Sequence, residues 1–220
     1  MDEYTTTTND KTENNATITV CIGNYGYYNE GILRDKWVSL PMAPSDLARW
    51  TKDNGLRDEA HEETYVSDFD GKPFDTRLLD CASIEQINQI AFAMAYAGES
   101  GVEATSAVIR LDGAPKSIDG LIKLLYASDE IGYTEFQLDH WGQPSLELYA
   151  YDFAEETGLL QVLQEQNAES YFDFEHYGQD LMMDVLSDET GFIGDIPDYE
   201  SYSIDEVLHA IGYTTREEGR

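Results

Sequence analysis

Residues 18–40, ITVCIGNYGYYNEGILRDKWVSL, decide how the fold begins. Apolar side chains alternate with small or polar ones along 16–22, and this period of two predicts a β-strand. The apolar face of that strand holds Ile18, Val20 and Ile22. A turn rich in Gly, Asn and Tyr follows and ends at Gly31, and a second short strand is predicted over 37–40. The stretch therefore predicts two strands of a small antiparallel sheet.

The surrounding sequence predicts a small β-rich domain with one helix over residues 16–80. A short helix is expected over 45–51 and a third strand over 63–69. Before the first strand, residues 1–15 are polar and lack the apolar stretch of a signal peptide. We expect these first residues to form a disordered tail.

Residues 81–135 predict a mainly helical middle domain. Ser83 opens a capping-box pattern, and apolar residues recur behind it at helical spacing until Gly98. A second helix is expected to begin at Ser117. Between the two helices, residues 107–111 predict a short strand.

Residues 136–220 predict an acidic α+β domain. Apolar residues over 146–153 follow the i, i+3, i+4, i+7 pattern of a helix, and Gly158 is its expected C-terminal stop. Ser203 and Glu206 have the spacing of a capping box before a last helix. The whole chain is thus predicted to be an elongated α+β protein of three small domains.

The chain is strongly acidic, with 44 Asp and Glu against 13 Lys and Arg and a net charge of −31. Direct binding to nucleic acid or to an anionic membrane surface needs Lys and Arg, so this balance argues against both. The acids are unevenly placed, because the stretch from Leu124 to Thr215 holds 21 acids and no base. They stand one or two at a time among apolar residues, which is typical of a folded module with an anionic surface.

An acidic excess of this size is larger than solubility requires, since a net charge of about 2–8 suffices for a small domain. Adaptation to high salt would give an even excess along the chain, and the base-free stretch counts against it. Duplex DNA carries one charge per roughly 1.7 Å of axis, so 31 net charges match roughly 50 Å, or about 15 base pairs. The charge therefore favours a protein that resembles another polyanion.

The sequence contains no motif that predicts catalysis, a metal ion or a cofactor. Residues 68–71 (DFDG) resemble the start of a calcium loop but lack its further ligands, so they predict a turn. The four histidines have no metal-binding spacing. Cys21 and Cys81 are expected to be reduced thiols in a cytoplasmic protein, and no apolar run is long enough to span a membrane. We therefore expect a protein that is not an enzyme.

Aromatic residues cluster near the centre of the acidic region. They are Tyr171, Phe172, Phe174 and Tyr177. One interpretation is that they pack in a core. The other is that they form an interface, such as a homodimer seam, because Tyr combines contact area with a hydroxyl group.

Two stretches resemble the ArdA family of antirestriction proteins. The first is the opening stretch, with the Y-N-E-G element at 28–31 and Trp37 in the next strand. The second, over 151–181, contains E-E-T-G at 155–158 and then YFDFEHYGQDL at 171–181. The resemblance covers most of the chain and is weakest in the middle.

The resemblance implies both a fold and a function. ArdA proteins look like bent B-DNA, consist of three small domains in a row and dimerise through the third. They occupy the DNA-binding groove of type I restriction-modification enzymes, and mobile genetic elements carry them so that incoming DNA survives. They have no active-site residues, because the working part is a distributed array of carboxylates. This chain departs from the family pattern in its N-terminal tail and in residues 186–220, where a further acidic helix is predicted.

We therefore expect a non-catalytic antirestriction protein whose partners are a type I restriction-modification enzyme and a second copy of the chain, with no nucleic acid and no membrane. An alternative is an acidic chaperone or sequestering module for basic DNA-binding proteins, and the choice of target separates the two. A hydrolase with incidental acids is a third hypothesis, which loss of activity confined to one or two residues would identify. The carboxylates expected to stand for phosphates are Asp129, Glu130, Glu135, Asp139, Glu147, Asp152, Glu155, Glu156, Asp184, Asp188, Glu189, Asp195, Asp198, Asp205 and Glu206.

Overall fold

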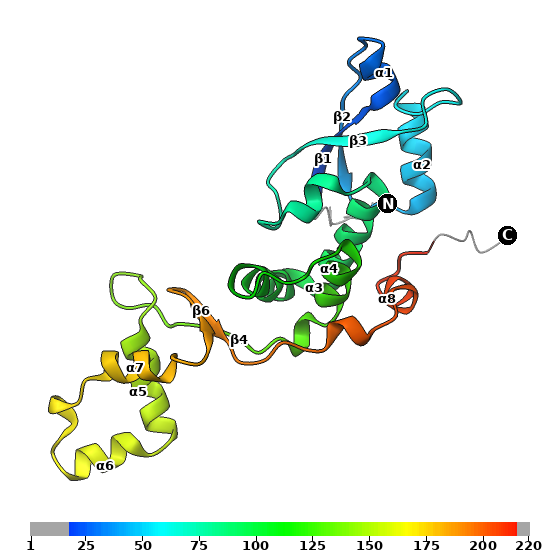
Figure 1. The fold of residues 1–220 in the computed structure, drawn as a ribbon. Coiled ribbons are helices and arrows are strands. Elements are labelled where there is room, and N and C mark those ends of the chain that lie inside the picture. Colours follow the sequence, from blue (N-terminus) through cyan, green and yellow to red (C-terminus); the bar gives the residue numbers. More distant parts are fainter. Residues whose placement is uncertain (1–17, 215–220) are drawn as a thin grey trace, which may run out of the picture.

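The computed structural model describes residues 18–214, and the predicted tail over 1–15 lies outside these residues. The described chain is an α+β structure with eight α-helices and two small antiparallel sheets. It extends along one direction instead of forming a ball (Figure 1).

The first sheet forms where the sequence predicts it. Its three antiparallel strands lie in the order β2-β1-β3. Their bounds are β1 (Ile18–Asn24), β2 (Lys36–Leu40) and β3 (Thr64–Phe69). The apolar face predicted for the first strand is confirmed, because Ile18, Val20 and Ile22 are buried in the main core.

Two helices accompany this sheet, α1 (Tyr25–Asn29) and α2 (Pro44–Asp53). The second confirms the helix predicted over 45–51. The first stands where a turn is predicted from the Gly, Asn and Tyr content. The Asn24 side chain accepts a hydrogen bond from the Tyr27 backbone N–H at 3.1 Å, and this cap starts a helical turn.

The longest helix is α3 (Ile84–Leu111), which follows the 3₁₀ turn η1 (Arg77–Cys81). Its predicted capping box is confirmed. Ser83 Oγ accepts from the Gln86 backbone N–H at 3.2 Å, and Gln86 Oε1 accepts from the Ser83 N–H at 2.9 Å. Gly98 interrupts the helical geometry with φ 68° and ψ −177°, but helix resumes directly after it.

The strand predicted over 107–111 is wrong, because these residues form the last turns of α3. The physical reason lies in the spacing of the apolar residues. Ala104, Ala107, Val108 and Leu111 follow i, i+3, i+4, i+7, and this helical face packs in one cluster with residues of the following elements. The short β-branched pair at 108–109 is outweighed by this packing.

The middle of the chain continues with a second helix and a short strand. Their bounds are α4 (Ile118–Tyr126), η2 (Ser128–Glu130) and β4 (Tyr133–Glu135). Ser117 Oγ accepts from the Gly120 N–H at 3.0 Å, so the predicted helix start is confirmed.

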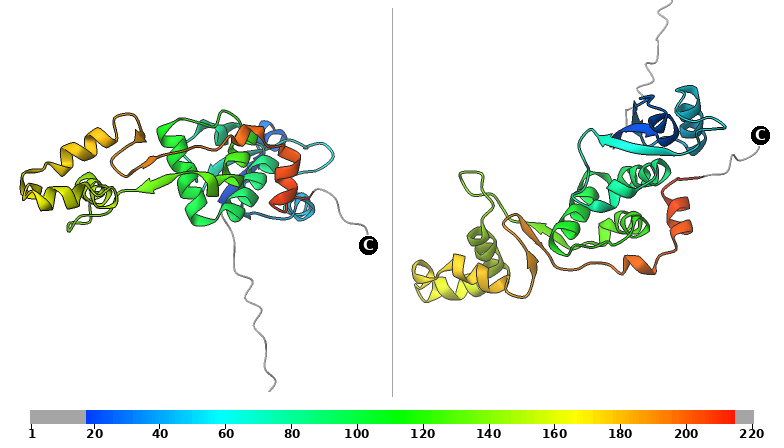
Figure 2. Two further views of the ribbon diagram at one scale, coloured as in Figure 1. Left: turned by 90° about the horizontal axis from the view of Figure 1, so that it is seen from below. Right: turned by 45° about the horizontal axis from the view of Figure 1, so that its top comes forward.

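After β4 the chain leaves the body of the molecule and forms a separate group of helices, residues 136–190, which we call the distal lobe (Figure 2). Its elements are α5 (Leu146–Glu156), α6 (Leu159–Glu165), η3 (Glu169–Tyr171), α7 (Phe174–Leu181) and β5 (Leu186–Ser187). The helix predicted over 146–153 is confirmed. Gly158, with φ 80°, separates α5 from α6 as the expected stop.

The distal lobe is joined to the body through a second sheet. Its strands lie in the order β4-β6-β5, where β6 is Gly191–Ile193. The outgoing and returning strands pair directly, with Glu135 opposite Gly191. A Cβ atom at Gly191 would lie 2.4 Å from the Thr134 carbonyl oxygen, so glycine is required for this close approach.

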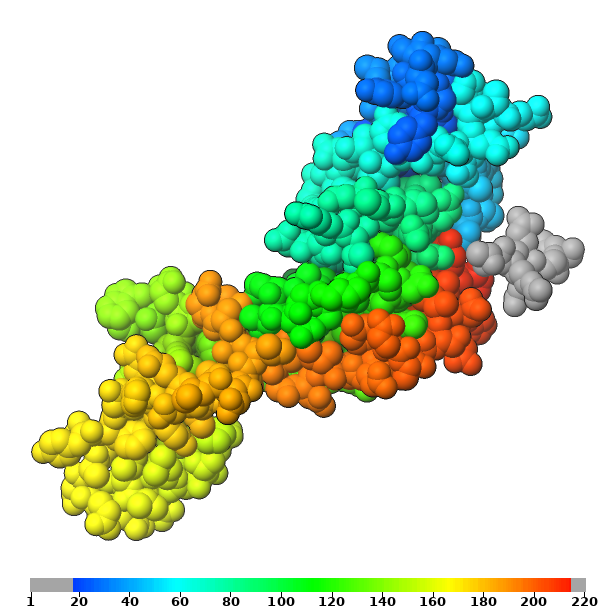
Figure 3. All heavy atoms as spheres, in the orientation of Figure 1, coloured from blue at the N-terminus to red at the C-terminus, as the bar shows by residue number. Residues whose placement is uncertain are grey.

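The returning chain ends against the body with η4 (Tyr199–Ser201) and α8 (Ile204–Ala210). It contacts α4 along its length, and Figure 3 shows this segment beside the middle helices. Ser203 makes no capping hydrogen bond from its side chain, so the predicted capping box there is wrong, although the helix does begin at the next residue.

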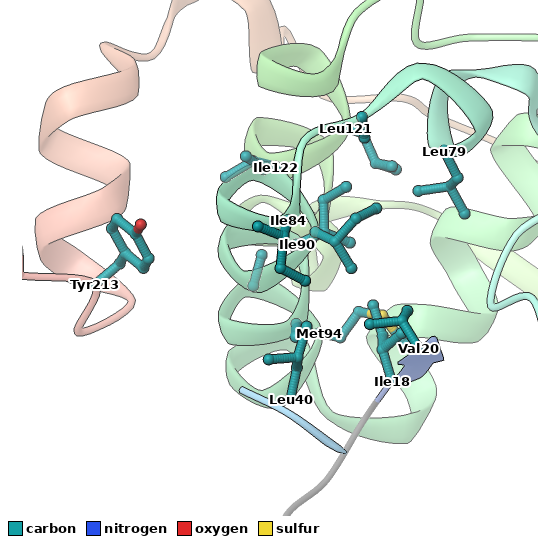
Figure 4. Close-up of a cluster of buried hydrophobic side chains, with 14 of the residues drawn as sticks. Ile18, Val20, Leu40, Leu79, Ile84, Ile90, Met94, Leu121, Ile122 and Tyr213 are labelled. Carbon is teal, nitrogen blue, oxygen red and sulfur yellow. The ribbon is translucent and has the colours of Figure 1, made fainter. Parts of the chain in front are cut away.

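Within residues 18–214, buried apolar side chains form three clusters. The first and largest joins β1 and β2 with α3, α4 and the C-terminal residues Val207, Ile211 and Tyr213 (Figure 4). The second lies between the end of α3, α4 and β6, and the third holds the helices of the distal lobe together. One core thus contains residues of both predicted ranges, 16–80 and 81–135, together with Val207, Ile211 and Tyr213. The division into three domains stays a prediction.

Candidate functional surface

The carboxylates predicted to stand for phosphates are mostly at the surface. Three of the fifteen are partly buried, namely Asp139, Asp152 and Asp188. The others are exposed, namely Asp129, Glu130, Glu135, Glu147, Glu155, Glu156, Asp184, Glu189, Asp195, Asp198, Asp205 and Glu206. They are spread over the distal lobe, β4, the turns and loops of the body, and α8.

The three partly buried carboxylates hold local structure together. Asp139 accepts from the backbone N–H groups of Trp141 at 2.8 Å and Gln143 at 2.9 Å, and so it fixes a loop. Asp152 accepts from the side-chain amide of Gln137. Because their oxygens already have donors, these groups are less available to an external partner than the exposed carboxylates.

Asp188 is the most constrained acid of the predicted set. It accepts from the backbone N–H of Thr190 at 2.8 Å and from the Thr190 hydroxyl at 2.6 Å, and it forms an ion pair with Arg110. Burial by itself would raise the pKa of Asp188, but the hydrogen bonds from Thr190 and Arg110 outweigh it and lower that pKa to about 2. Asp188 is therefore a structural anion at neutral pH.

Crowding of like charges is visible where α3 meets β4. The pKa of Glu103 is raised, mainly by a hydrogen bond with Glu135 and further by burial and the charge of Glu135. Glu99 adds to the same effect. Two of these three acids, Glu99 and Glu103, are absent from the predicted set, although both are exposed.

Sequence reasoning also missed exposed acids within the distal lobe. They are Glu165, Asp173, Glu175 and Asp180. The signal that finds them is the helical period of 174–181. Phe174 and Gly178 are buried on one side, which places Glu175 and Asp180 on the outer side. The anionic surface is thus broader than predicted.

Few positively charged residues balance the acids in the part of the chain after Arg77. The described bases after Arg77 are Arg110, Lys116 and Lys123. Each has an intramolecular acceptor: Arg110 binds Asp188, Lys116 binds the Gly113 carbonyl oxygen, and Lys123 lies 3.5 Å from a Glu200 carboxylate oxygen. From Leu124 to Thr214 no base is present at all.

The four aromatic residues proposed as a dimer interface divide into two groups. Phe172, Phe174 and Tyr177 pack in the apolar cluster of the distal lobe, with the Phe172 and Phe174 ring centres 4.9 Å apart. Tyr171 is 89% exposed. Tyr171 therefore remains as a contact candidate at the surface, while the other three have a structural role.

The described residues were compared with the requirements of a metal-ion cluster and of a membrane-spanning helix. Within residues 18–214 there is no group of three His, Cys, Asp or Glu side chains arranged to hold a metal ion. Over the same residues, every helix is too short or too polar to cross a membrane. An open cavity of about 770 Å³ between α2 and the loop over 57–64 is lined by charges of both signs, including Lys52, Arg57 and Glu63.

The molecule is an elongated acidic protein that exposes carboxylates over a wide surface. The three bases described after Arg77 have partners within the chain. The comparison with known families specifies this class further. The model of the family described as antirestriction protein (ArdA) matches residues 20–194. The chain therefore belongs to the ArdA family of antirestriction proteins, a family of non-catalytic inhibitors, and the resemblance seen in the sequence is confirmed. No curated protein matches the chain.

Proposed function

We propose that this protein mimics B-DNA and occupies the DNA-binding groove of a type I restriction-modification enzyme, which it inhibits without catalysis. Membership of the ArdA family supports antirestriction as its function. The surface of residues 124–214 supports the proposed mimicry, because exposed carboxylates lie there on helices and loops and no Lys or Arg occurs between them.

The physical basis of the proposed binding is charge pairing. A groove that binds DNA presents Arg and Lys to phosphates, and carboxylates accept the same charge-assisted hydrogen bonds. The molecule is long in one direction (Figure 3), and exposed carboxylates occur on both the distal lobe and the body, so the charge is distributed over an extended molecule as it is in a duplex. Each pair contributes little by itself, because exposed ion pairs are screened by solvent. Affinity then comes from the number of pairs.

A homodimer would double the length of this charged surface. We propose that the distal lobe carries the contact, with Tyr171 at its centre. Exposed apolar side chains lie on the same lobe, with Val162 at 55% and Met183 at 78% exposure. Such residues favour a protein contact, because burying them removes apolar surface from water.

The first experiment measures DNA cleavage by a purified type I enzyme while this protein is titrated in. The expected result is inhibition near stoichiometric amounts that weakens steeply with salt and is relieved by competitor DNA. Methylation by the same enzyme is followed in parallel. If no ratio inhibits, and the protein instead releases abundant basic proteins from DNA, the sequestering alternative replaces mimicry.

Two variants with equal charge test whether the position of the carboxylates matters. The first neutralises five exposed acids of the distal lobe by Asp→Asn and Glu→Gln changes at Glu147, Glu155, Glu156, Asp184 and Glu189. Five carboxylates at about 0.5 kcal/mol each give about 2.5 kcal/mol, so inhibition should weaken roughly 70-fold.

The matched control neutralises five exposed acids near the first sheet, at Asp53, Glu59, Glu62, Asp70 and Asp75. It changes the net charge by the same amount as the first variant, so mimicry by the distal carboxylates predicts a much smaller loss of inhibition. Equal losses in both variants would show that only net charge matters. Complete loss from a single substitution would indicate a catalytic site instead.

A further inference from the structure

The distal lobe is attached to the body by few contacts. The chain passes into it through β4 and out of it through β6, and these two strands pair with each other. The apolar contacts at the junction are the second cluster, where Ile193 packs against the end of α3 and α4, and the rings of Phe136 and Tyr149, which lie beside Phe192 of β6. Because the strands are short and these apolar groups are small, the direction of the lobe also depends on the polar contacts beside them.

Arg110 makes a charged contact at this junction. It lies in the last turn of α3, and its Nε donates to Asp188 Oδ2. Its second nitrogen, Nη2, donates to the Thr190 hydroxyl at 3.0 Å. Asp188 and Thr190 belong to the turn between β5 and β6, so one guanidinium ties the body to the turn that ends the lobe. Its planar shape serves two acceptors at once.

A positive charge at this place works against an anionic surface. If charge were the only requirement, a neutral or acidic residue would serve better than Arg110. Asp188 is likewise withdrawn from the exposed array, with a side chain that is 18% exposed. Both charges are therefore committed to the contact between two parts of the chain that are 78 residues apart.

We propose that Arg110 is a positioning residue, which fixes the direction of the distal lobe and thereby the spacing between carboxylates on the lobe and on the body. The importance of that spacing for inhibition rests on the proposed function. A lobe that samples many directions would match a rigid groove only part of the time, and the apparent affinity falls with the matching fraction.

The test measures the distance between the body and the distal lobe in the full chain. Spin labels are attached at Ala95→Cys on α3 and Gln161→Cys on α6, which are both exposed, in a Cys81→Ser background. Arg110→Met removes the charge and the donors but keeps an aliphatic stem. The expected result is a broader distance distribution than in the labelled parent, while Arg110→Lys restores a narrow one.

Lys123→Met is the matched control. Lys123 also joins the outgoing chain to the returning chain, but its partner Glu200 belongs to η4 and not to the turn that ends the lobe. It changes net charge equally and should leave the distance distribution unchanged. If Arg110→Met keeps a narrow distribution, or if Lys123→Met broadens it as much, the proposal is wrong. Should Arg110→Met fail to fold, Thr190→Val removes the acceptor of Arg110 Nη2 and the hydroxyl that donates to Asp188, without changing charge, and it should also broaden the distance distribution.

Inhibition of a type I enzyme is a second measurement, for which a charge effect and a loss of positioning predict changes in opposite directions. Both Met variants make the protein more negative, so a pure charge effect predicts equal or stronger inhibition from each. Loss of positioning predicts that Arg110→Met alone weakens inhibition, about tenfold if the matching population falls to about a tenth. If the parent inhibits no enzyme, the proposed function fails, but the distances still decide the role of Arg110.

Discussion

His61 lies with both ring nitrogens facing carboxylates. Nδ1 is 2.8 Å from Asp58 Oδ1, and Nε2 is 3.1 Å from Glu30 Oε1. The ring stacks on Tyr27 at 4.0 Å, and the Arg34 guanidinium also lies 4.0 Å from the Tyr27 ring centre. A neutral imidazole donates from one nitrogen only, so both contacts are satisfied only when His61 is protonated.

This arrangement predicts a pH dependence of stability. Hydrogen bonds with Glu30 and then Asp58 raise the pKa of His61 above its ordinary value of 6.5. A raised pKa means that the stabilisation is fully present below about pH 6.5 and is lost as the pH rises through the folded-state pKa. The free energy of unfolding from urea titrations should therefore decrease over this range.

His61→Gln is the control for this prediction, because it keeps a hydrogen-bonding side chain without titrating. Its stability curve should be flatter than that of the parent over the same pH range. An NMR titration of the His61 ring gives the pKa directly. A value below 6.5, or equal pH curves for both proteins, would contradict the interpretation.

At the scale of elements, two serines with the same sequence signal have different roles. Ser83 and Ser203 each precede a helix and each stand three residues before a Gln or Glu. Only Ser83 accepts a hydrogen bond from the backbone N–H of its helix. Ser83→Ala should therefore lower the free energy of unfolding by about 1 kcal/mol, and Ser203→Ala should change it by less than about 0.5 kcal/mol.

Thermal and urea unfolding of both variants provide the measurement, with each serving as the control for the other. Equal losses would mean that Ser203 forms its cap in solution. A larger loss from Ser203→Ala would contradict the assignment altogether.

The same comparison shows what the sequence could predict about the elements. Local signals with a direct physical cause were reliable, such as the alternation from Ile18 to Ile22, the cap at Ser83 and the stop at Gly158. For other residues, packing between segments that are distant in the sequence determined the secondary structure. Residues 107–111 became helix because their apolar face meets Leu124 and Ile193, and no pattern within five residues reports such a contact.

The candidate surface was predictable in kind but not in detail. Exposure of the acids follows from their position on the polar sides of helices and in turns and loops, so most of the fifteen carboxylates could be found from the sequence. The structural use of Asp188 could not, since its partner Arg110 is 78 residues away. Aromatic clusters were ambiguous for the same reason, and only the fold separates exposed Tyr171 from buried Phe174.

At the scale of the whole molecule, the net charge of −31 makes the acids repel one another, and salt screens this repulsion. Raising ionic strength from about 0.1 M to about 1 M shortens the screening length from about 10 Å to about 3 Å. Repulsion among 44 acids then weakens more than the attraction of the few ion pairs. The Tm measured by differential scanning calorimetry should therefore rise with KCl concentration.

The variant with five neutralised acids in the distal lobe is the control for this effect. Its Tm should be higher at low salt and should depend less on KCl. A Tm that falls with salt in the parent protein would show that attractive ion pairs, such as Arg110 with Asp188, outweigh the repulsion.

The distal lobe begins and ends on neighbouring strands, where Glu135 lies opposite Gly191. Because the two ends of this segment lie side by side, its length and sequence can change without altering the path of the chain on either side. Replacing residues 137–189 by a short Asn-Gly turn would leave β4 and β6 as an ordinary hairpin that closes the body. Of the 44 acids of this protein, 13 therefore lie in a part that could be lengthened, shortened or exchanged while the main apolar core keeps its composition.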